Sequence, residues 1–497
     1  MLARFRLLFH TLRFLRWEQL LGRVWIRVPR RVPQGELLPL REAGDTWESP
    51  QGRVASFQPP HTFTFLGQAR RVADATSWND ATVPKLWLYN LHYFDDLNAG
   101  NPAMREDAHR ELCDRWIQEN PPAEGNGWEP YPVSLRVVNW IKWAQSGRPV
   151  DSRWRLSLVQ QVRWLRKHLE YHLLGNHLFA NAKALLFAGA FFDGDEAEAW
   201  RTKGLQLLRQ ELQEQFLGDG GHFERSPMYH AILLEDVLDL LQLAKVYPGL
   251  IEPSDLASWR EVAERGTKWL MAMLHPDEQL SLFNDCALNI ALPPKSLFTY
   301  ACHVGAPCPK HVDSVFLGDS GYVRLTAVEA TLLLDAAPVG PDYLPGHAHA
   351  DTLSFELSLG RSRLLVNTGT SVYGTGDKRL YQRGTAAHNT VVVDETDSSE
   401  VWGGFRVARR AYPRSLQVDL AGGRVACAHD GYRRLPGKVL HHRSWHLEAS
   451  GLEVVDQLEG NWQSAVACLH LHPDVEASVK VWVRKSVPLA SICRPFS

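Results

Sequence analysis

The stretch PGHAHADTLSFELS, residues 345–358, combines an alternating apolar pattern with side chains that handle protons or metals. Alternate side chains of a β-strand share one face, so an extended chain here places His347, His349 and Asp351 together. Phe355 continues that face with a ring suited to the interior of a sandwich. The stretch therefore predicts a buried strand whose polar end emerges at the rim. The alternative is a hydrogen-bonded surface cluster without chemistry.

The sequence on either side of this stretch divides into a helical part and a strand part. From about residue 312 the apolar period is two, as in GYVRLTAVEATLLLDA at 321–336. Between about 86 and 300, apolar residues recur at steps of three and four, as in AILLEDVLDLLQLAKVY at 231–247. No fixed-period repeat accompanies these helices, which favours a closed (α/α) toroid over a solenoid.

These patterns predict an α+β multidomain chain. We expect an N-terminal lead-in at 1–85, an (α/α) toroid, as an incomplete barrel, at 86–311, and an antiparallel β-sandwich at 312–497. Ligand sites are frequent at domain junctions, so we expect a groove where the toroid meets the sandwich.

Composition excludes several function classes. The 54 Lys and Arg nearly cancel the 56 Asp and Glu among 497 residues, so we expect no nucleic-acid partner, and any attraction for a polyanion must be local. Seven dispersed cysteines without a CxxC pair argue against a disulfide framework and a structural zinc site, and favour mostly buried thiols. The 18 Trp suit either stacking on sugars or a large core.

The first 31 residues, MLARFRLLFHTLRFLRWEQLLGRVWIRVPRR, are basic and amphipathic. Arginines interrupt every apolar run, so the segment lacks the continuous hydrophobic centre of a secretory signal peptide. It predicts a helix that either makes peripheral contact with an anionic membrane or docks on the following domain.

Three helical segments carry candidate functional residues. In GNHLFANAKAL, Asn176 and His177 stand at a predicted helix start, where free N–H groups favour anions, although Asn176 also suits a simple N-cap. In ERSPMYHA, Pro227 is expected to open a helix with Tyr229 in its first turn, a position that equally suits the core.

The third segment is GWEPYPVSLRVVNW at 127–140. Arg136 there suits a bidentate clamp on a substrate carboxylate, or an internal partner. Trp128 and Tyr131 precede it as candidate substrate contacts.

Taken in order, these segments resemble the heparinase II/III family of polysaccharide lyases, with GHAHAD followed by HNT as the specific part. The resemblance implies a toroid joined to a sandwich, an acidic polysaccharide as substrate, and β-elimination at a uronic acid. By resemblance, Asn176 and His177 neutralise the substrate carboxylate, Tyr229 serves as acid or base, and His347 assists proton transfer. Tyr373, in LLVNTGTSVYG, is predicted as a further substrate contact.

The resemblance also implies a divalent metal, zinc or calcium-like, with a structural role. His349 and His388 match ligand positions, but Asn367 stands where an aspartate is expected. A neutral amide binds divalent ions less well than a carboxylate, so the site is weakened, altered or absent, and Asp351 is a candidate replacement. A second departure is that Ala180 and Asn181 stand where some relatives have a glutamate after the Asn-His pair.

Two other functions remain open at this stage. A glycoside hydrolase needs two opposed carboxyl groups, for which Glu224, Asp219 and Asp236 are available. A non-catalytic polysaccharide-binding protein of exopolysaccharide assembly would keep the groove without turnover. The variant resembles those associated with bacterial exopolysaccharide. A polymer substrate suggests the periplasm, whereas no export signal is evident.

Overall fold

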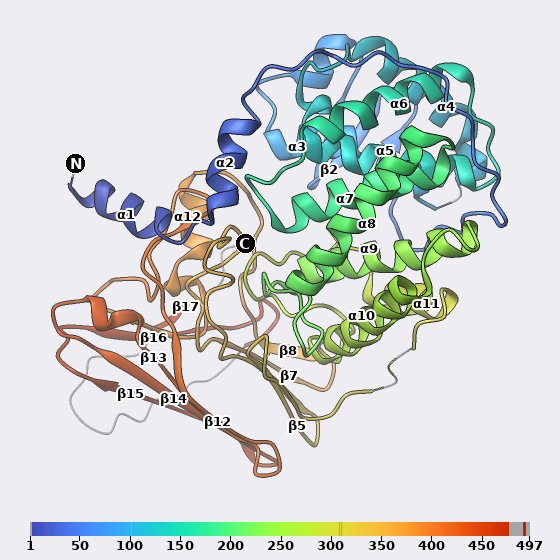
Figure 1. Ribbon diagram of the computed structural model, residues 1–497. Helices are drawn as coiled ribbons and strands as arrows, with labels where there is room; N and C mark the ends of the chain where they lie inside the picture. Colours follow the sequence, from blue (N-terminus) through green and yellow to red (C-terminus); the bar gives the residue numbers. More distant parts are fainter. Residues whose placement is uncertain (1, 101, 308, 310, 477–490, 494–497) are drawn as a thin grey trace.

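The computed structural model describes residues 2–100, 102–307, 309, 311–476 and 491–493. A helical domain and a β-sandwich lie side by side, and the N-terminal helices α1 (Leu2–Leu12) and α2 (Trp17–Trp25) lie at their junction (Figure 1). A small sheet of β1 (Phe57–Gln58), β2 (Thr62–Phe65) and β3 (Gln68–Arg71) precedes the helical domain.

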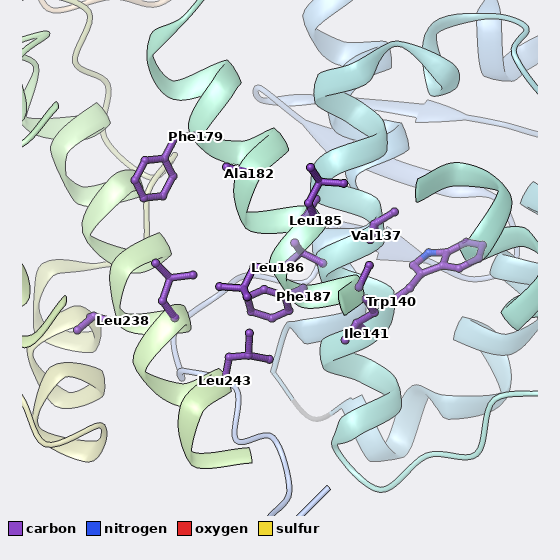
Figure 2. Close-up of a cluster of buried hydrophobic side chains, with 14 of the residues drawn as sticks. Val137, Trp140, Ile141, Phe179, Ala182, Leu185, Leu186, Phe187, Leu238 and Leu243 are labelled. Carbon is purple, nitrogen blue, oxygen red and sulfur yellow. The ribbon is translucent and has the colours of Figure 1, made fainter. Parts of the chain in front are cut away.

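The helical domain is the predicted toroid. Its helices are α3 (Lys85–Tyr93), α4 (Glu106–Glu119), α5 (Pro130–Gln145), α6 (Ser152–Lys167), α7 (Gly175–Phe191), α8 (Asp195–Gln215), α9 (Pro227–Val246), α10 (Pro253–Ala272) and α11 (Pro294–His303). Figure 2 shows Trp140 of α5, Phe187 of α7 and Leu243 of α9, which belong to one buried cluster. Burial of each such side chain stabilises the fold by about 1.5–3 kcal/mol. Nearly every residue of α7 is buried, because this helix is surrounded by α5, α6, α8 and α9.

The sandwich consists of two antiparallel sheets. One has the order β4 (Val315–Leu317), β5 (Tyr322–Ala327), β6 (Ala330–Asp335), β7 (Phe355–Leu359), β8 (Ser362–Leu365). The other has the order β12 (Pro413–Asp419), β13 (Arg424–His429), β14 (Leu440–Glu448), β15 (Gly451–Glu459). Phe355 from the first sheet and Trp445 from the second share one buried cluster.

Shorter elements complete this domain. β9 (Val391–Val393) pairs antiparallel with β16 (Ala465–His470), and β17 (Ser491–Cys493) pairs with β16 in parallel, an exception to the predicted antiparallel pattern. β10 (Val401–Trp402) and β11 (Arg406–Val407) form a hairpin near α12 (Asp377–Arg383). Helices occupy 85–303 and the main sheets begin at Val315; the predicted domain limits stay predictions.

One strand prediction is wrong. β7 begins only at Phe355, and residues 345–354 form a loop in which Leu353 has a φ of 69°, outside the extended region. His347, His349 and Asp351 therefore do not share a strand face. His347 and His349 come together through Asp285, which is distant in sequence.

The state of the cysteines and the hydropathy of the helices bear on two sequence predictions. Cys113, Cys286 and Cys427 are buried free thiols, as predicted for most cysteines, whereas Cys302 forms a disulfide bond. Among the described residues, every helix is too short or too polar to cross a membrane.

Candidate active site between the toroid and the sandwich

The toroid contributes a histidine at the start of α7. The Nδ1 atom of His177 lies 3.0 Å from Oε1 of Glu170, and the ring of Tyr131 lies 4.3 Å from its ring. Burial lowers the pKa of His177, but the Glu170 carboxylate raises it further, so the net shift is upward. His177 is therefore an imidazolium at slightly acidic pH, beside the buried Asn176.

Tyr229 comes from the first turn of α9. Its backbone N–H donates to Oγ of Ser226, the N-cap, at 3.3 Å, which fixes the turn that aims the phenol. The ring stacks on that of His347 with centroids 3.8 Å apart, and the two hydroxyls of Tyr229 and Tyr373 lie 3.3 Å apart. Burial, then Tyr373 and Asp285, hold the pKa of Tyr229 well above 10, so the phenol is neutral.

His347 reaches this stack from the sandwich loop. Its Nδ1 lies 2.9 Å from Oδ2 of Asp285, and Nε2 of His349 lies 2.8 Å from Oδ1 of the same carboxylate. Arg379 contacts both oxygens of Asp285. Burial alone would raise the pKa of Asp285, but these hydrogen bonds hold it well below 3.8. Asp285 is thus ionised and accepts from Nδ1–H of His347, which leaves Nε2 unprotonated whenever the ring is neutral.

The carboxyl of Glu224 lies between His177 of the toroid and His347 of the sandwich. Its Oε2 lies 3.8 Å from Nε2 of His347, and its charge also acts on His177. The carboxyl is buried and has no side-chain hydrogen-bond partner within the described residues, although the backbone N–H of Asn176 acts to lower its pKa. Burial raises its pKa above 4.5, although His347 and His177 oppose that shift. Gly175 permits this approach, because a Cβ there would lie 2.8 Å from Oε1 of Glu224.

The structure therefore brings together five of the residues singled out in the sequence: Asn176, His177, Tyr229, His347 and Tyr373. Tyr131 lies against His177 at the same cleft. The side chains of His177 and His347 keep 28% and 16% of their surface exposed, so solvent reaches both domains' contributions.

Sequence reasoning missed four residues that shape the cleft: Glu224 as a buried carboxyl, Asp285, Arg379 and Phe405. Asp285 lies in LFNDC at 282–286, a segment to which sequence reasoning assigned no role. Phe405, 47% exposed, stacks on Tyr373 with ring centroids 6.0 Å apart, and forms an apolar platform beside His347.

Two predicted substrate contacts are wrong. Arg136 is fully buried and donates to Gln161 and to the carbonyls of His92 and Gly127, at 2.9, 3.2 and 2.8 Å. Its guanidinium has no solvent-exposed surface, so it does not face a carboxylate in the cleft. Trp128 is also in the core, where its indole N–H donates to a backbone carbonyl.

The metal-ligand candidates cluster behind His347. His349, Asp351 and His388 are buried, with ligand atoms within 4.8 Å of one another. Nδ1 of His349 and Nε2 of His388 have no hydrogen-bond partner in the described part of the chain. Burial lowers the pKa of both imidazoles, which keeps them in the neutral form that binds metals. Two imidazoles and a carboxylate fit zinc.

Asn367, which the sequence predicted as a metal ligand, contacts His388 and is not one of the three clustered residues. Its Oδ1 lies 2.6 Å from Nδ1 of His388. When Nδ1–H donates to this amide, Nε2 is left as the ligand atom of His388. The amide thus orients the imidazole, and Asp351 is the carboxylate of the group that could hold a metal ion.

A separate cavity of about 980 Å³ lies between α10, α11 and the five-stranded sheet, lined by residues such as Met271, Phe298 and Thr326. None of its lining residues belongs to the cleft just described. The cleft residues that the sequence singled out for proton transfer and carboxylate binding lie outside this cavity, between the toroid and the sandwich.

Comparison with known families decides the classification. Residues 107–296 match the Heparinase II/III N-terminus, and residues 309–485 match the Heparinase II/III-like, C-terminal domain. The chain belongs to the heparinase II/III family. A heparinase III crystal structure aligns with a TM-score of 0.58 at 18% identity, covering 82% of this chain and 66% of that one. A heparan sulfate lyase mutant from Pedobacter heparinus aligns with a TM-score of 0.51 at 20% identity, covering 80% and 67%. These likenesses support the shared fold.

Two relatives that are similar in sequence carry different names. The heparin-sulfate lyase of Bacteroides stercoris is 27% identical over 377 residues, which cover 68% of this chain and 54% of the relative. The chain of this heparinase II/III family member thus spans about half the length of that lyase. FtsZ-localized protein C of Caulobacter vibrioides is 26% identical over 447 residues, covering 83% and 74%.

Proposed function

We propose that this heparinase II/III family protein is a polysaccharide lyase that cleaves a uronic-acid-containing polysaccharide by β-elimination. The observation that carries the proposal is the stack of Tyr229 on His347 across the domain boundary, with Glu224 and His177 beside it. This arrangement provides a proton carrier on one side of a sugar and groups that bind a carboxylate on the other.

β-Elimination removes the C5 proton of a uronate and expels the sugar linked at C4. The C5 proton is very weakly acidic while the adjacent carboxylate is ionised. An enzyme must therefore neutralise this carboxylate, supply a base at C5 and protonate the leaving oxygen.

Three groups suit the carboxylate. The Asn176 amide donates hydrogen bonds, and the imidazolium of His177 supplies a positive charge that Glu170 maintains. Glu224, whose pKa burial raises, supplies a carboxyl O–H when protonated. No side chain of the described residues accepts this O–H, so a substrate that enters between His177 and His347 can accept it. It thereby replaces the acidic helper that Ala180 and Asn181 do not provide.

Tyr229 and His347 suit the proton transfers. With Nδ1–H held by Asp285, the Nε2 lone pair of a neutral His347 is free to accept a proton. The neutral phenol of Tyr229 is an acid for the leaving oxygen, or passes a proton through the adjacent Tyr373 hydroxyl. Which of the two groups abstracts the C5 proton depends on the face of the sugar that the cleft accepts.

The substrate is an acidic polysaccharide. Relatives named heparin-sulfate lyases support this class, and Phe405 and Tyr373 offer apolar surface to sugar rings. A bacterial exopolysaccharide rich in uronic acid is the finer proposal. The metal is a further one: a zinc ion held by His349, Asp351 and His388 would tie the loop of His347 to β9 and leave proton transfer to the cleft residues.

Two alternatives make different demands on these residues. A glycoside hydrolase needs two free opposed carboxyls, yet Asp219 accepts from Ser320, and Asp236 contacts Lys183. That leaves Glu224 without a second carboxyl. A non-catalytic binding protein is the second alternative, and one relative that aligns with more of this chain than the Bacteroides stercoris lyase, FtsZ-localized protein C, is not named as a lyase.

The deciding experiment incubates the protein with alginate, heparan sulfate, hyaluronan and uronate-containing bacterial exopolysaccharides. A lyase yields products with the ultraviolet absorbance of a new C4–C5 double bond and no added water by mass spectrometry. Products heavier by one water would establish a hydrolase. Binding of a polymer without any cleavage would leave the binding protein.

A further inference from the structure

The two N-terminal helices present an apolar and basic surface that no proposed catalytic role uses. We propose that α1 and α2 form a docking surface for an anionic lipid membrane. The inference is independent of the proposed lyase activity, because it rests on residues 4–31 and not on the cleft.

The outer face of these helices is strongly apolar. Phe5 and Phe9 of α1 are 71% and 58% exposed. On α2, Trp17, Leu21 and Val24 are between 57% and 66% exposed. Soluble proteins rarely expose so many large apolar side chains side by side unless the surface has a partner.

The inner face is fixed to the body of the protein, so the apolar face has a defined outward direction. Thr11 accepts a hydrogen bond from the Trp402 indole at 3.1 Å. Gln19 donates to the Tyr343 carbonyl at 3.2 Å, and Arg16 contacts Glu214 at 2.5 Å. The helices therefore bridge the sandwich and the toroid, as their place in Figure 1 illustrates.

Charge identifies the partner. Residues 4–31 contain eight arginines and one acidic residue, Glu18, although the whole chain has a net charge of −2. Two copies of this surface would repel each other, which disfavours self-association. An anionic lipid surface instead offers headgroups to Arg27 and Arg31, which are exposed, and an acyl boundary to the leucines and tryptophans.

Aliphatic content favours lipid over a polyanionic sugar chain. Sugars stack on flat aromatic rings, whereas Leu20, Leu21, Val24 and Val28 offer branched aliphatic surface. α1 has 11 residues and spans only about 16 Å, so it lies along the interface and does not cross a hydrocarbon core of about 30 Å. Gln19 binds the loop that continues to His347, so docking would hold the cleft close to the lipid surface.

The test is co-sedimentation of the full chain with vesicles of phosphatidylcholine alone, or with about one quarter phosphatidylglycerol. We expect binding to the anionic vesicles, weakened by salt, and little binding to the neutral ones. The combined variant Leu21→Ser, Val24→Ser, Trp25→Ser should reduce binding more than tenfold, because three apolar side chains that would be buried in the lipid are lost. The control variant replaces Val54, Met104 and Val328 with serine, because these three side chains are even more exposed and lie outside the surface.

A second pair tests the charge. Arg27→Ser with Arg31→Ser should reduce the affinity roughly thirtyfold, at about 1 kcal/mol per arginine. Arg361→Ser with Arg433→Ser, both exposed elsewhere, should leave it unchanged. Circular dichroism and thermal unfolding establish that each variant is folded.

Three results would overturn the proposal: no vesicle binding by folded wild-type protein, binding that ignores lipid charge, or binding that survives both sets of substitutions. An oligomer that the serine variants dissociate would assign the face to a second copy of the chain. Retention on heparan sulfate that depends on this face, without vesicle binding, would assign it to a polysaccharide.

Discussion

Asp285 in the loop before α11 lies 2.9 Å from Nδ1 of His347, 62 residues further along the chain. The same carboxylate receives Arg379 and His349, so one buried charge organises the proposed catalytic histidine, a candidate metal ligand and a buried guanidinium. The cleft depends on this carboxylate more than on any local sequence pattern.

Replacement of Asp285 with asparagine should destabilise the protein by about 3–5 kcal/mol, because it leaves the buried Arg379 without its counter-charge. Urea denaturation of wild type and variant measures the difference. The control, Asp377→Asn, alters an exposed carboxyl on the same helix as Arg379 and should change stability little. A loss below about 1 kcal/mol for the first variant would show that Arg379 does not need this charge.

Tyr229→Phe should keep polysaccharide binding and lower turnover by about 10²–10⁴-fold, the usual contribution of a positioned acid or base. The stack on His347 survives, since only the hydroxyl is removed. Release of unsaturated product measures turnover, and calorimetry with an uncleaved oligosaccharide measures binding. Tyr247→Phe is the control, because it deletes a toroid hydroxyl that bonds Gln145. Wild-type turnover in both variants would exclude Tyr229 as a proton carrier.

Glu224→Gln should become more stable relative to wild type as the pH rises. Burial raises the pKa of Glu224 in the folded state above about 4.5, so the stability of the wild type is fully present below that value. This contribution of Glu224 to stability is lost as the pH rises through its folded pKa, because a buried carboxylate then forms beside Asp285. The charges of His177 and His347 compensate for it only in part. The glutamine variant has no such loss.

Thermal unfolding of both proteins between about pH 5 and 8 measures this prediction. Glu329→Gln, at an exposed position, is the control. A difference between Glu224→Gln and wild type that stays constant with pH would mean that Glu224 is already ionised throughout that range.

The repeat of apolar residues predicted the toroid and the sandwich because it depends only on neighbours along one element. The loop at 345–354 escaped this reasoning for a physical reason. Its alternating pattern suits a strand, but Leu353 takes a left-handed φ and Asp285 holds His347 and His349 from outside the segment. Long-range hydrogen bonds overrode the local pattern.

Glu224 and Arg136 show the same limit from opposite directions. Glu224 looked like one of several acidic residues, and only the fold places it between His177 and His347. Arg136 looked like a substrate clamp, but its carbonyl partners at His92 and Gly127 lie in other segments. Sequence alone does not distinguish a buried guanidinium from one that faces a ligand.

Metal removal should lower the unfolding midpoint if zinc occupies the cluster of His349, Asp351 and His388. A ligand that binds only the folded state stabilises it by about 3–4 kcal/mol at 100 to 1,000 times its dissociation constant. Mass spectrometry of protein prepared without a histidine tag measures the metal content, and chelation followed by thermal unfolding measures the effect. Asp351→Asn should lose the metal. A midpoint insensitive to chelation, with no metal detected, would contradict the proposal.

Arg136→Lys should reduce stability by about 2–4 kcal/mol, because an ammonium lacks the planar fork that satisfies three acceptors at once. Arg136 also stacks 3.7 Å over Trp116, a contact that a lysine does not reproduce in the same geometry. Urea denaturation measures the loss, and Arg361→Lys at the exposed surface serves as the control. The affinity of folded Arg136→Lys for an acidic oligosaccharide should match wild type, since Arg136 does not reach the cleft. A weakened affinity with unchanged stability would return Arg136 to the substrate site and contradict its place in the core.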